Sequence, residues 1–445
     1  MDHPDSELPV RDLAVDCYRV SGVVLIVLGH WLDACVTYHD GHFGRQNPLV
    51  DLPWTQWLTW VFQAVPVFFL VAGYAGAVSW THRRDVAGMS RQAWLQHRLA
   101  RVLGPTTVYV AVVSVVVVAL GIADVAGSAL EYGGWAVAMH LWFLAVYLLV
   151  VSLTPLAMAA QRRWGLWTLA VLAAGLAALD AASLGGHLRY LGQLKYLLCW
   201  GTLYQLGIAW HAGLFAGRRA VALAAGTAAV LGLLVGLGPY PVSMIGVPGQ
   251  PVQNSDPPSL AMLAYAGTQA GVVMALAPAL NRALRSPAVH RAVSVANSTV
   301  MGLYLWHMVP VVIVAIAGYP AGLLPQPPEG TASWWLARLV WVVILGLVTT
   351  VEMTLLWWWR RFFAAPLPLL GTALPGRRAE PMMLVGAAMA VYGLWVFAAD
   401  GFAPGGRFAW LTALVFAVGV FVVALRPAAQ ASRRPLGSRS DEHDD

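Results

Sequence analysis

Long apolar runs separated by short polar segments dominate this chain of 445 residues. A bilayer core about 30 Å thick needs about 20 mostly apolar residues per helix. The pattern therefore predicts an all-α polytopic membrane bundle. The sixth of its predicted spans, with Lys195 and Gln205, is the least apolar. The twelve predicted spans are residues 18–37, 58–80, 103–122, 138–158, 166–184, 195–213, 220–238, 259–279, 297–318, 334–358, 380–398 and 409–425.

Composition supports the same class. Hydrophobic residues make up 59% of the chain and charged residues only 11%, whereas a soluble globular protein carries about 25% charged residues. The three cysteines, Cys17, Cys35 and Cys199, form no CxxC pair, so we expect neither a disulfide scaffold nor a metal site. P-loop, GxSxG and HExxH motifs are absent, which argues against an ATP-driven pump and against soluble hydrolases. We also expect no nucleic-acid partner.

The distribution of basic residues predicts the orientation. With the N-terminus inside, 22 of the 27 lysines and arginines fall on the inner side, as positively charged loops do in membrane proteins. Both termini are therefore expected in the cytoplasm of a multi-pass cell-membrane protein. The external loop 239–258, rich in proline and glycine, is predicted to be a lid or an entrance.

The same reading divides the chain into four segments. They are a cytoplasmic N-terminal segment (1–17), a membrane domain (18–360), two additional helices (361–426) and a disordered cytoplasmic tail (427–445).

Arg19 and His30 lie in the first span. Eleven residues of helix place them within roughly 20° of one face and about 16 Å apart along the axis. Ionisable groups inside a membrane usually mark a site or a pathway. Arg19 can also be an anchor at the cytoplasmic interface, and His30 can be a hydrogen-bonded structural residue. Their shared face favours function.

Arg98 and Arg101 precede the third span in the segment HRLARVLGP (97–105). That segment follows a basic loop and is predicted to end at a helix-start proline, Pro105. The two arginines are three residues apart and project from one side of the incoming helix. They are either ordinary topology anchors or a cationic mouth for a phosphorylated ligand, since guanidinium groups match phosphate oxygens.

Five further residues are candidates for a substrate pathway. His140 and Trp142 open the fourth span, and His307 lies several residues inside the ninth. An interfacial aromatic belt explains the tryptophan but not His307. Glu352 lies within the tenth span and has a plain explanation as a buried, protonated or paired carboxyl group. Tyr74 lies among small residues that favour close helix packing.

Taken in order, these motifs resemble the acyltransferase-3 family of integral membrane acyltransferases. The resemblance rests on Arg19 and His30 preceded by Asp16, then on VPVFFLVAGY, HRLARVLGP, HLWFL and YLWH, and spans roughly residues 12–360. Ala72 stands where the family usually has the serine of an SGY triplet, so any hydroxyl role there is lost. The common family core has ten spans, and this chain adds about two.

The resemblance implies transfer of an acyl group, acetyl or another short chain, from cytosolic acyl-CoA to a hydroxyl group. The acceptor would be a glycan of the cell envelope, a lipid or a secondary metabolite. Acyl-CoA is a donor substrate, and no cofactor is expected to stay bound. Arg98 and Arg101 would hold the donor, and Arg19, on the same side of the membrane, would be a catalytic residue together with His30. His30 would act as a general base or as a transient acyl carrier.

The main alternative is a secondary transporter or exporter with Arg19, His30, His307 and Glu352 along its path. Twelve spans with both ends inside is also a common transporter layout. The ordered motifs and the lack of a visible internal repeat argue against it. A membrane sensor or scaffold would give no reason for the Arg–His stripe.

Overall fold

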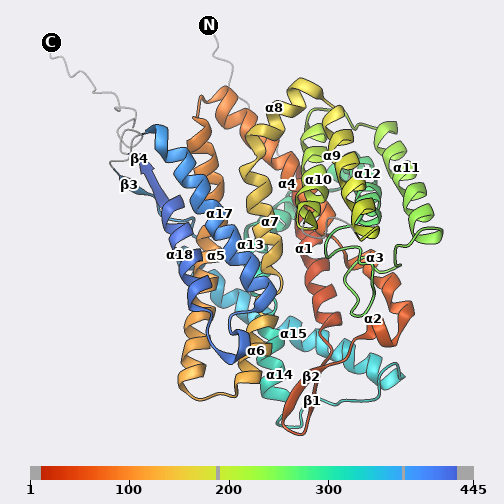
Figure 1. Cartoon of the computed structure of the whole chain (residues 1–445), viewed down its shortest axis with the longest axis vertical. Helices are drawn as coiled ribbons and strands as arrows, with labels where there is room; N and C mark the ends of the chain where they lie inside the picture. The colour runs from red at the N-terminus through yellow and green to blue at the C-terminus, as the bar shows by residue number, and fades with distance from the viewer. Residues whose placement is uncertain (1–11, 187–190, 373–375, 428–445) are drawn as a thin grey trace, which may run out of the picture.

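The computed structural model is a bundle of helices that run mostly between two opposite ends of the molecule (Figure 1). It describes residues 12–186, 191–372 and 376–427, so the predicted disordered tail lies almost wholly outside the described residues. The all-α prediction is confirmed. The helices are α1 (Leu13–Asp33), α2 (Pro48–Asp51), α3 (Thr59–Phe62), α4 (Val65–Trp80), α5 (Arg91–Ile122), α6 (Gly127–Ala136), α7 (Leu141–Ser152), α8 (Thr154–Trp164), α9 (Trp167–Leu184), α10 (Leu194–His211), α11 (Arg218–Gly236), α12 (Leu260–Ala283), α13 (Pro287–Trp306), α14 (Val309–Gly318), α15 (Ala332–Trp358), α16 (Arg360–Phe363), α17 (Gly376–Asp400) and α18 (Trp410–Ala424).

Strands are few and short. β1 (Val36–His39) and β2 (His42–Arg45) form an antiparallel hairpin directly after α1. β3 (Leu370–Thr372) and β4 (Leu425–Pro427) pair in parallel. Non-α helical segments are the 3₁₀ helices Pro53–Leu58 and Pro404–Gly406 and the π-helix Thr81–Val86.

The number of spans is lower than the sequence predicted. Within the described residues, eight helices are long and apolar enough to cross a membrane, or ten if each of two bent pairs is one span. The bent pairs are α6 with α7 (41°) and α13 with α14 (51°). The other two predicted spans correspond to α10, which carries Lys195 and Gln205, and to α18, which has 15 residues. Length and composition therefore support ten of the twelve.

Two helices begin earlier than their hydrophobicity predicted because a capping side chain starts each of them. The Asp12 carboxylate accepts hydrogen bonds from the first backbone N–H groups of α1, and Ser90 Oγ accepts one from Ala93 in α5. The prediction that Pro105 starts a helix is wrong, since it lies inside the 32-residue α5. Arg98 and Arg101 consequently lie within the helix.

Hydrogen bonds tie the 239–258 loop to its surroundings. Asn254 Nδ2 donates to the carbonyls of Pro241 and Ser243 (2.8 and 2.9 Å), and Gln63 Nε2 donates to that of Met244 (3.0 Å). Ser243 and Asn254 are fully buried. The loop predicted as a lid or an entrance is thus fixed against the segment before α4, and it does not line the pocket described below.

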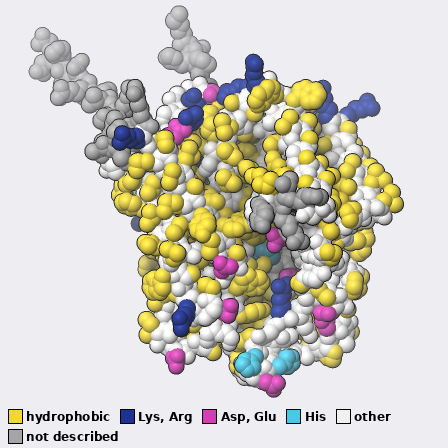
Figure 2. Space-filling model, in the orientation of Figure 1, with side chains coloured by type: hydrophobic (Ala, Val, Ile, Leu, Met, Phe, Trp, Pro, Cys, Tyr) yellow, Lys and Arg dark blue, Asp and Glu magenta, His cyan; other side chains and the backbone are white. Residues whose placement is uncertain are grey.

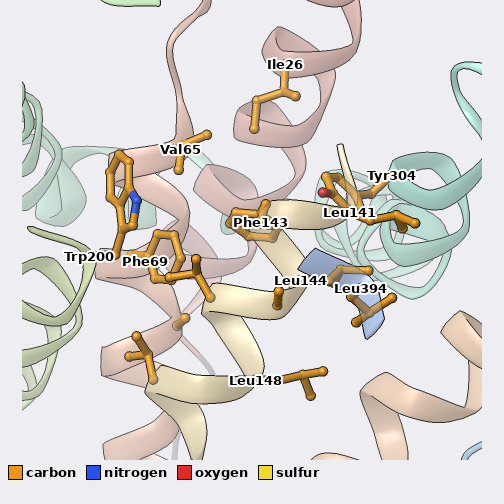
Figure 3. Close-up of a cluster of buried hydrophobic side chains, with 14 of the residues drawn as sticks. Ile26, Val65, Phe69, Leu141, Phe143, Leu144, Leu148, Trp200, Tyr304 and Leu394 are labelled. Carbon is orange, nitrogen blue, oxygen red and sulfur yellow. The ribbon is translucent and has the colours of Figure 1, made fainter. Parts of the chain in front are cut away.

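α7 lies at the centre of the buried core. Leu141, Phe143 and Leu144 are almost completely buried and pack among side chains from α1, α4, α10, α13 and α17 (Figure 3). The rings of Phe69 and Trp200 stack with their centroids 5.2 Å apart on one side of this cluster. This packing places the start of α7, and with it His140, beside the end of α13.

The outer surface of the bundle is apolar. Leu339, Val343 and Leu347, spaced four residues apart on α15, are 61–66% exposed. Figure 2 shows apolar side chains over most of one face and Lys and Arg side chains along its upper edge, the end at which α5 begins. Such a surface suits contact with lipid chains, and a chain with this many apolar helices is a multi-pass membrane protein.

α4 and α10 cross at very short range through glycines. A Cβ atom on Gly73 of α4 would lie 1.9 Å from the carbonyl oxygen of Tyr204 in α10. A Cβ atom on Gly201, also in α10, would meet nothing within 4 Å. We expect Gly73→Ala to lower the free energy of unfolding by about 1–3 kcal/mol, because the helices must move apart. Gly201→Ala is the control and should be neutral or slightly stabilising, since alanine favours helix.

Thermal unfolding of the detergent-purified variants measures both effects. Equal melting temperatures for Gly73→Ala and Gly201→Ala would contradict the close crossing.

Candidate active site

Three histidines that are far apart in the sequence converge where two bent spans and α1 meet. His30 is near the end of α1, His140 immediately precedes α7, and His307 immediately follows α13. His30 Nδ1 and His307 Nε2 are 2.8 Å apart. The ring centroids of His140 and His307 are 4.9 Å apart. The structure thus joins three of the predicted residues in one cluster.

A chain of hydrogen bonds fixes how the neutral rings are protonated. His307 Nδ1 lies 2.7 Å from the carbonyl oxygen of Tyr304, and a carbonyl only accepts. His307 must therefore carry its proton on Nδ1, which leaves Nε2 as an acceptor for the Nδ1–H of His30. The remaining nitrogen of His30, Nε2, then holds a free lone pair. His30 is oriented and supported in the way that a general base requires.

The break between α13 and α14 creates this geometry. The chain bends by 51° between α13 and α14, which interrupts the helical hydrogen bonds, so carbonyl groups near the break need other partners. The Tyr304 carbonyl accepts from the His307 ring, and the His307 carbonyl accepts from Trp31 Nε1 at 2.9 Å. His307 was predicted to lie inside a continuous span. It lies instead at the break, where the Tyr304 carbonyl orients its ring.

A pocket opens beside His30 at the hairpin end of α1. It contains about 680 Å³ of space between protein atoms, part of it open to the exterior. Its walls come from the end of α1, the β1–β2 hairpin, α6 and α14. Figure 1 shows these elements together at the end opposite the start of α5.

The pocket has one polar corner in an otherwise apolar lining. His30, Asp33, Arg45 and Tyr132 supply the polar groups, while side chains such as Met308 and others from α14 supply apolar surface. Asp33 Oδ2 is paired with Arg45. Asp33 Oδ1 is buried and has no partner among the described residues. A buried polar atom without a partner is uncommon in folded proteins, and this one lies in a residue of the pocket wall.

Arg19 does not join the histidine cluster. It lies near the other end of α1, where its Nη1 is 3.3 Å from Asn297 Oδ1 and 4.0 Å from Asp16 Oδ1. Asn297 Nδ2 in turn donates to Asp16 at 2.9 Å. Arg19 and His30 both contact the α13 side of the bundle, and the Arg19 network ties the start of α1 to α13.

The predicted donor-binding arginines lie near the start of α5. Arg98 is half-buried with its guanidinium carbon 5.7 Å from the centre of the Trp94 ring, and Arg101 is exposed. Both arginines and Arg83 interact electrostatically with His97. The group is a compact cationic surface that can receive phosphate oxygens.

The other predicted pathway residues stay outside the cluster. Tyr74 donates to Asp12 at 3.4 Å and packs on the Trp210 ring, near the start of α1. Trp142 packs against the Trp200 ring, whose centroid is 6.3 Å away. Glu352 is partly buried, and within the described part of the chain its Oε2 has no partner.

Sequence reasoning missed several residues of the site. Tyr304 supplies the carbonyl that orients His307 and donates its hydroxyl proton to the carbonyl of His140. Its position three residues before His307 in YLWH, and Pro310 three residues after, were available signals. Asp33 follows His30 by three residues on the same helix face. Tyr132 gave no signal because α6 reads as a loop before the fourth predicted span.

This arrangement can move a proton. No group of three or more His, Cys, Asp or Glu side chains within the described ranges could hold a metal ion. The three cysteines are free thiols. What remains is an oriented imidazole facing a pocket, a combination suited to removing a proton from a hydroxyl group.

Comparison with known families agrees with this chemistry. The model of a family described as an acyltransferase domain matches residues 12–358. No curated protein and no solved structure is significantly similar to the chain. The match covers more than half of the chain and begins at the residue that caps α1. The chain therefore belongs to the acyltransferase-3 family of membrane acyltransferases.

Proposed function

We propose that this protein moves a short acyl group from acyl-CoA to a hydroxyl group, with His30 as the general base. The observation that carries the proposal is the 2.8 Å contact between His30 Nδ1 and His307 Nε2, together with the carbonyl that fixes His307. These contacts leave His30 Nε2 able to take a proton beside the pocket.

The proposed reaction balances as a simple acyl transfer. His30 Nε2 takes the proton of the acceptor hydroxyl as its oxygen attacks the thioester carbonyl carbon. The C–S bond then breaks, and the CoA thiolate receives the proton from His30, which gives an ester and free CoA. The His30 to His307 hydrogen bond strengthens when His30 becomes positively charged. An acyl-histidine intermediate would use the same Nε2 atom.

The donor and the acceptor would reach His30 from opposite ends of the bundle. Arg98 and Arg101 lie at the end expected to face the cytosol, where acyl-CoA is found. About 16 Å separates Arg19 from His30 along α1, a length comparable to an extended pantetheine arm. The acceptor would occupy the pocket, where His30, Asp33 and Arg45 supply polar groups.

The acceptor is a hydroxyl group of a glycan, a lipid or a secondary metabolite. The mostly apolar pocket lining favours a hydroxyl group carried on a molecule with an apolar part. A transporter with an Arg/His/Glu pathway receives less support, because Arg19 is engaged by Asp16 and Asn297 and Glu352 lies outside the histidine cluster.

The first prediction concerns His30. His30→Gln keeps a polar side chain but cannot take the proton, so acyl transfer should fall by about 10²–10⁴-fold, the usual loss for a general base. Acyl-CoA binding and folding should be retained. His307→Gln keeps an acceptor for His30 and should lose less. The measurement is transfer of a labelled acyl group by purified protein.

His42→Gln is the matched control, since His42 is exposed on β2 at the same end of the molecule and does not line the pocket. Near-normal turnover by a folded His30→Gln protein would remove His30 from the mechanism.

The second prediction concerns the donor. Arg98→Ala and Arg101→Ala should raise the KM for acyl-CoA with little change in kcat, because the phosphate contacts they remove exist in ground and transition states alike. A charge-assisted contact contributes about 1.5–3 kcal/mol, which corresponds to roughly a tenfold to hundredfold rise in KM. Steady-state kinetics of the purified variants measure this.

Arg162→Ala is the control, because Arg162 is an exposed arginine paired with Asp85 on the same expected side. Unchanged acyl-CoA affinity in both Arg98→Ala and Arg101→Ala would reduce these arginines to topology anchors.

The third prediction concerns orientation. In a variant without the three native cysteines, Pro248→Cys should react with a membrane-impermeant thiol reagent in intact cells. Ala87→Cys should react only after lysis, because the arginine-rich side is expected in the cytoplasm. Both positions are exposed in the structure, so accessibility within the protein does not limit either reaction. The reverse labelling pattern would invert the topology.

A further inference from the structure

α17 and α18 lie outside the region that matches the family, yet they are packed into the core. Leu394 of α17 is fully buried beside Leu141 and Leu144 of α7 (Figure 3). The Trp395 ring packs edge-on to Tyr196, with centroids 5.0 Å apart. The pair is therefore joined to the elements that carry the site.

The turn between these helices, residues 401–409, lies against α6. Phe402 N–H donates to the Gly134 carbonyl at 3.3 Å, and Phe402 is fully buried against the Phe397 ring. A Cβ atom on Gly406 would lie 2.6 Å from the Gly127 Cα atom. The backbone of the turn thus contacts the backbone of α6 near both ends of that helix.

α6 has two functional faces. Ala129, Gly133 and Ala136 line the pocket beside His30, and their spacing of four and three residues places them on one face of the helix. Gly127 and Gly134 are seven residues apart on the opposite face, which meets the turn. One side of this helix is a pocket wall and the other is the contact with the turn.

α6 is a weak helix whose position depends on its neighbours. It has ten residues, three of them glycines, and neither end has a side-chain cap. Isolated helices shorter than about 12–15 residues are marginal, and an interior glycine costs about 1 kcal/mol relative to alanine. Packing on its two faces must therefore set where α6 lies.

We propose that the 401–409 turn is a positioning element that sets the distance of α6 from His30, and thereby selects which acceptors fit the pocket. The part of this proposal that concerns acceptors rests on the proposed acyl transfer; the part that concerns pocket width does not. The two helices beyond the family core thus act on specificity through α6, without touching the substrate.

Adjacent glycines of the turn provide a matched test. Gly406 (φ +76) and Gly405 (φ +59) share a left-handed backbone, so alanine strains both, but only a Cβ on Gly406 meets α6; one on Gly405 meets nothing within 4 Å. Gly406→Ala should lower kcat/KM for the acceptor by about tenfold to hundredfold, the scale of loss for a misplacement near 1 Å. Gly405→Ala should not, and the KM for acyl-CoA should stay unchanged in both.

A second readout is independent of catalysis. In a variant without native cysteines, Ala136→Cys places a thiol on the pocket wall, where Ala136 is 7% exposed. Its alkylation rate by a small thiol reagent should change several-fold when Gly406→Ala is added and stay constant with Gly405→Ala. If Gly406→Ala does not fold, Gly134→Ala tests the contact between the turn and α6 from the other side, because a Cβ atom on Gly134 would lie 3.2 Å from the backbone nitrogen of Ala403.

The two readouts separate the possible failures. Altered alkylation in a protein that transfers no acyl group would support the positioning role and refute the proposed activity. Active protein in which Gly406→Ala and Gly405→Ala behave alike in both assays would overturn the positioning role.

Discussion

The bundle depends on hydrogen-bond partners for the backbone groups of a helix that is broken within an apolar environment. Carbonyl groups released at the break between α13 and α14 have no water to bind, and leaving them unpaired would cost several kcal/mol each. Trp31 Nε1 pairs with one, and the ring of His307 pairs with another. The second partner is an imidazole, so this hydrogen bond also fixes which nitrogen of His307 carries the proton. The tautomer of His307 in turn fixes that of His30, because the two rings share a hydrogen bond.

The helix pair α1 and α13 carries a polar cluster near each of its two ends. α1 and α13 lie side by side and are joined by Asp16, Asn297 and Arg19 near one end and by His30 and His307 near the other. Burying a cation is costly unless it is paired, and the Asp16–Asn297 pair meets that need for Arg19. The imidazole end carries no such charge and is free to face a pocket. These two sets of contacts therefore fix how α1 and α13 are aligned along their length.

Much of the fold was predictable because a membrane leaves few choices. Apolar runs of about 20 residues must form helices, so every predicted span corresponds to a helix or a bent pair. Helix ends were less predictable, because Asp12 and Ser90 start α1 and α5 through local hydrogen bonds that hydropathy does not register. Pro105 stayed inside α5, although proline marks a helix start in many sequences.

For the site, the sequence by itself determined which residue types were out of place: an arginine and three histidines at the edges of or inside apolar runs. It also determined their order along the chain, which is enough for the family. Only the tertiary structure decided that His30, His140 and His307 meet while Arg19 does not join them. Spacing along one helix sets which face a residue occupies, but contacts between helices depend on where each neighbouring helix bends and packs, and that is a property of the whole bundle.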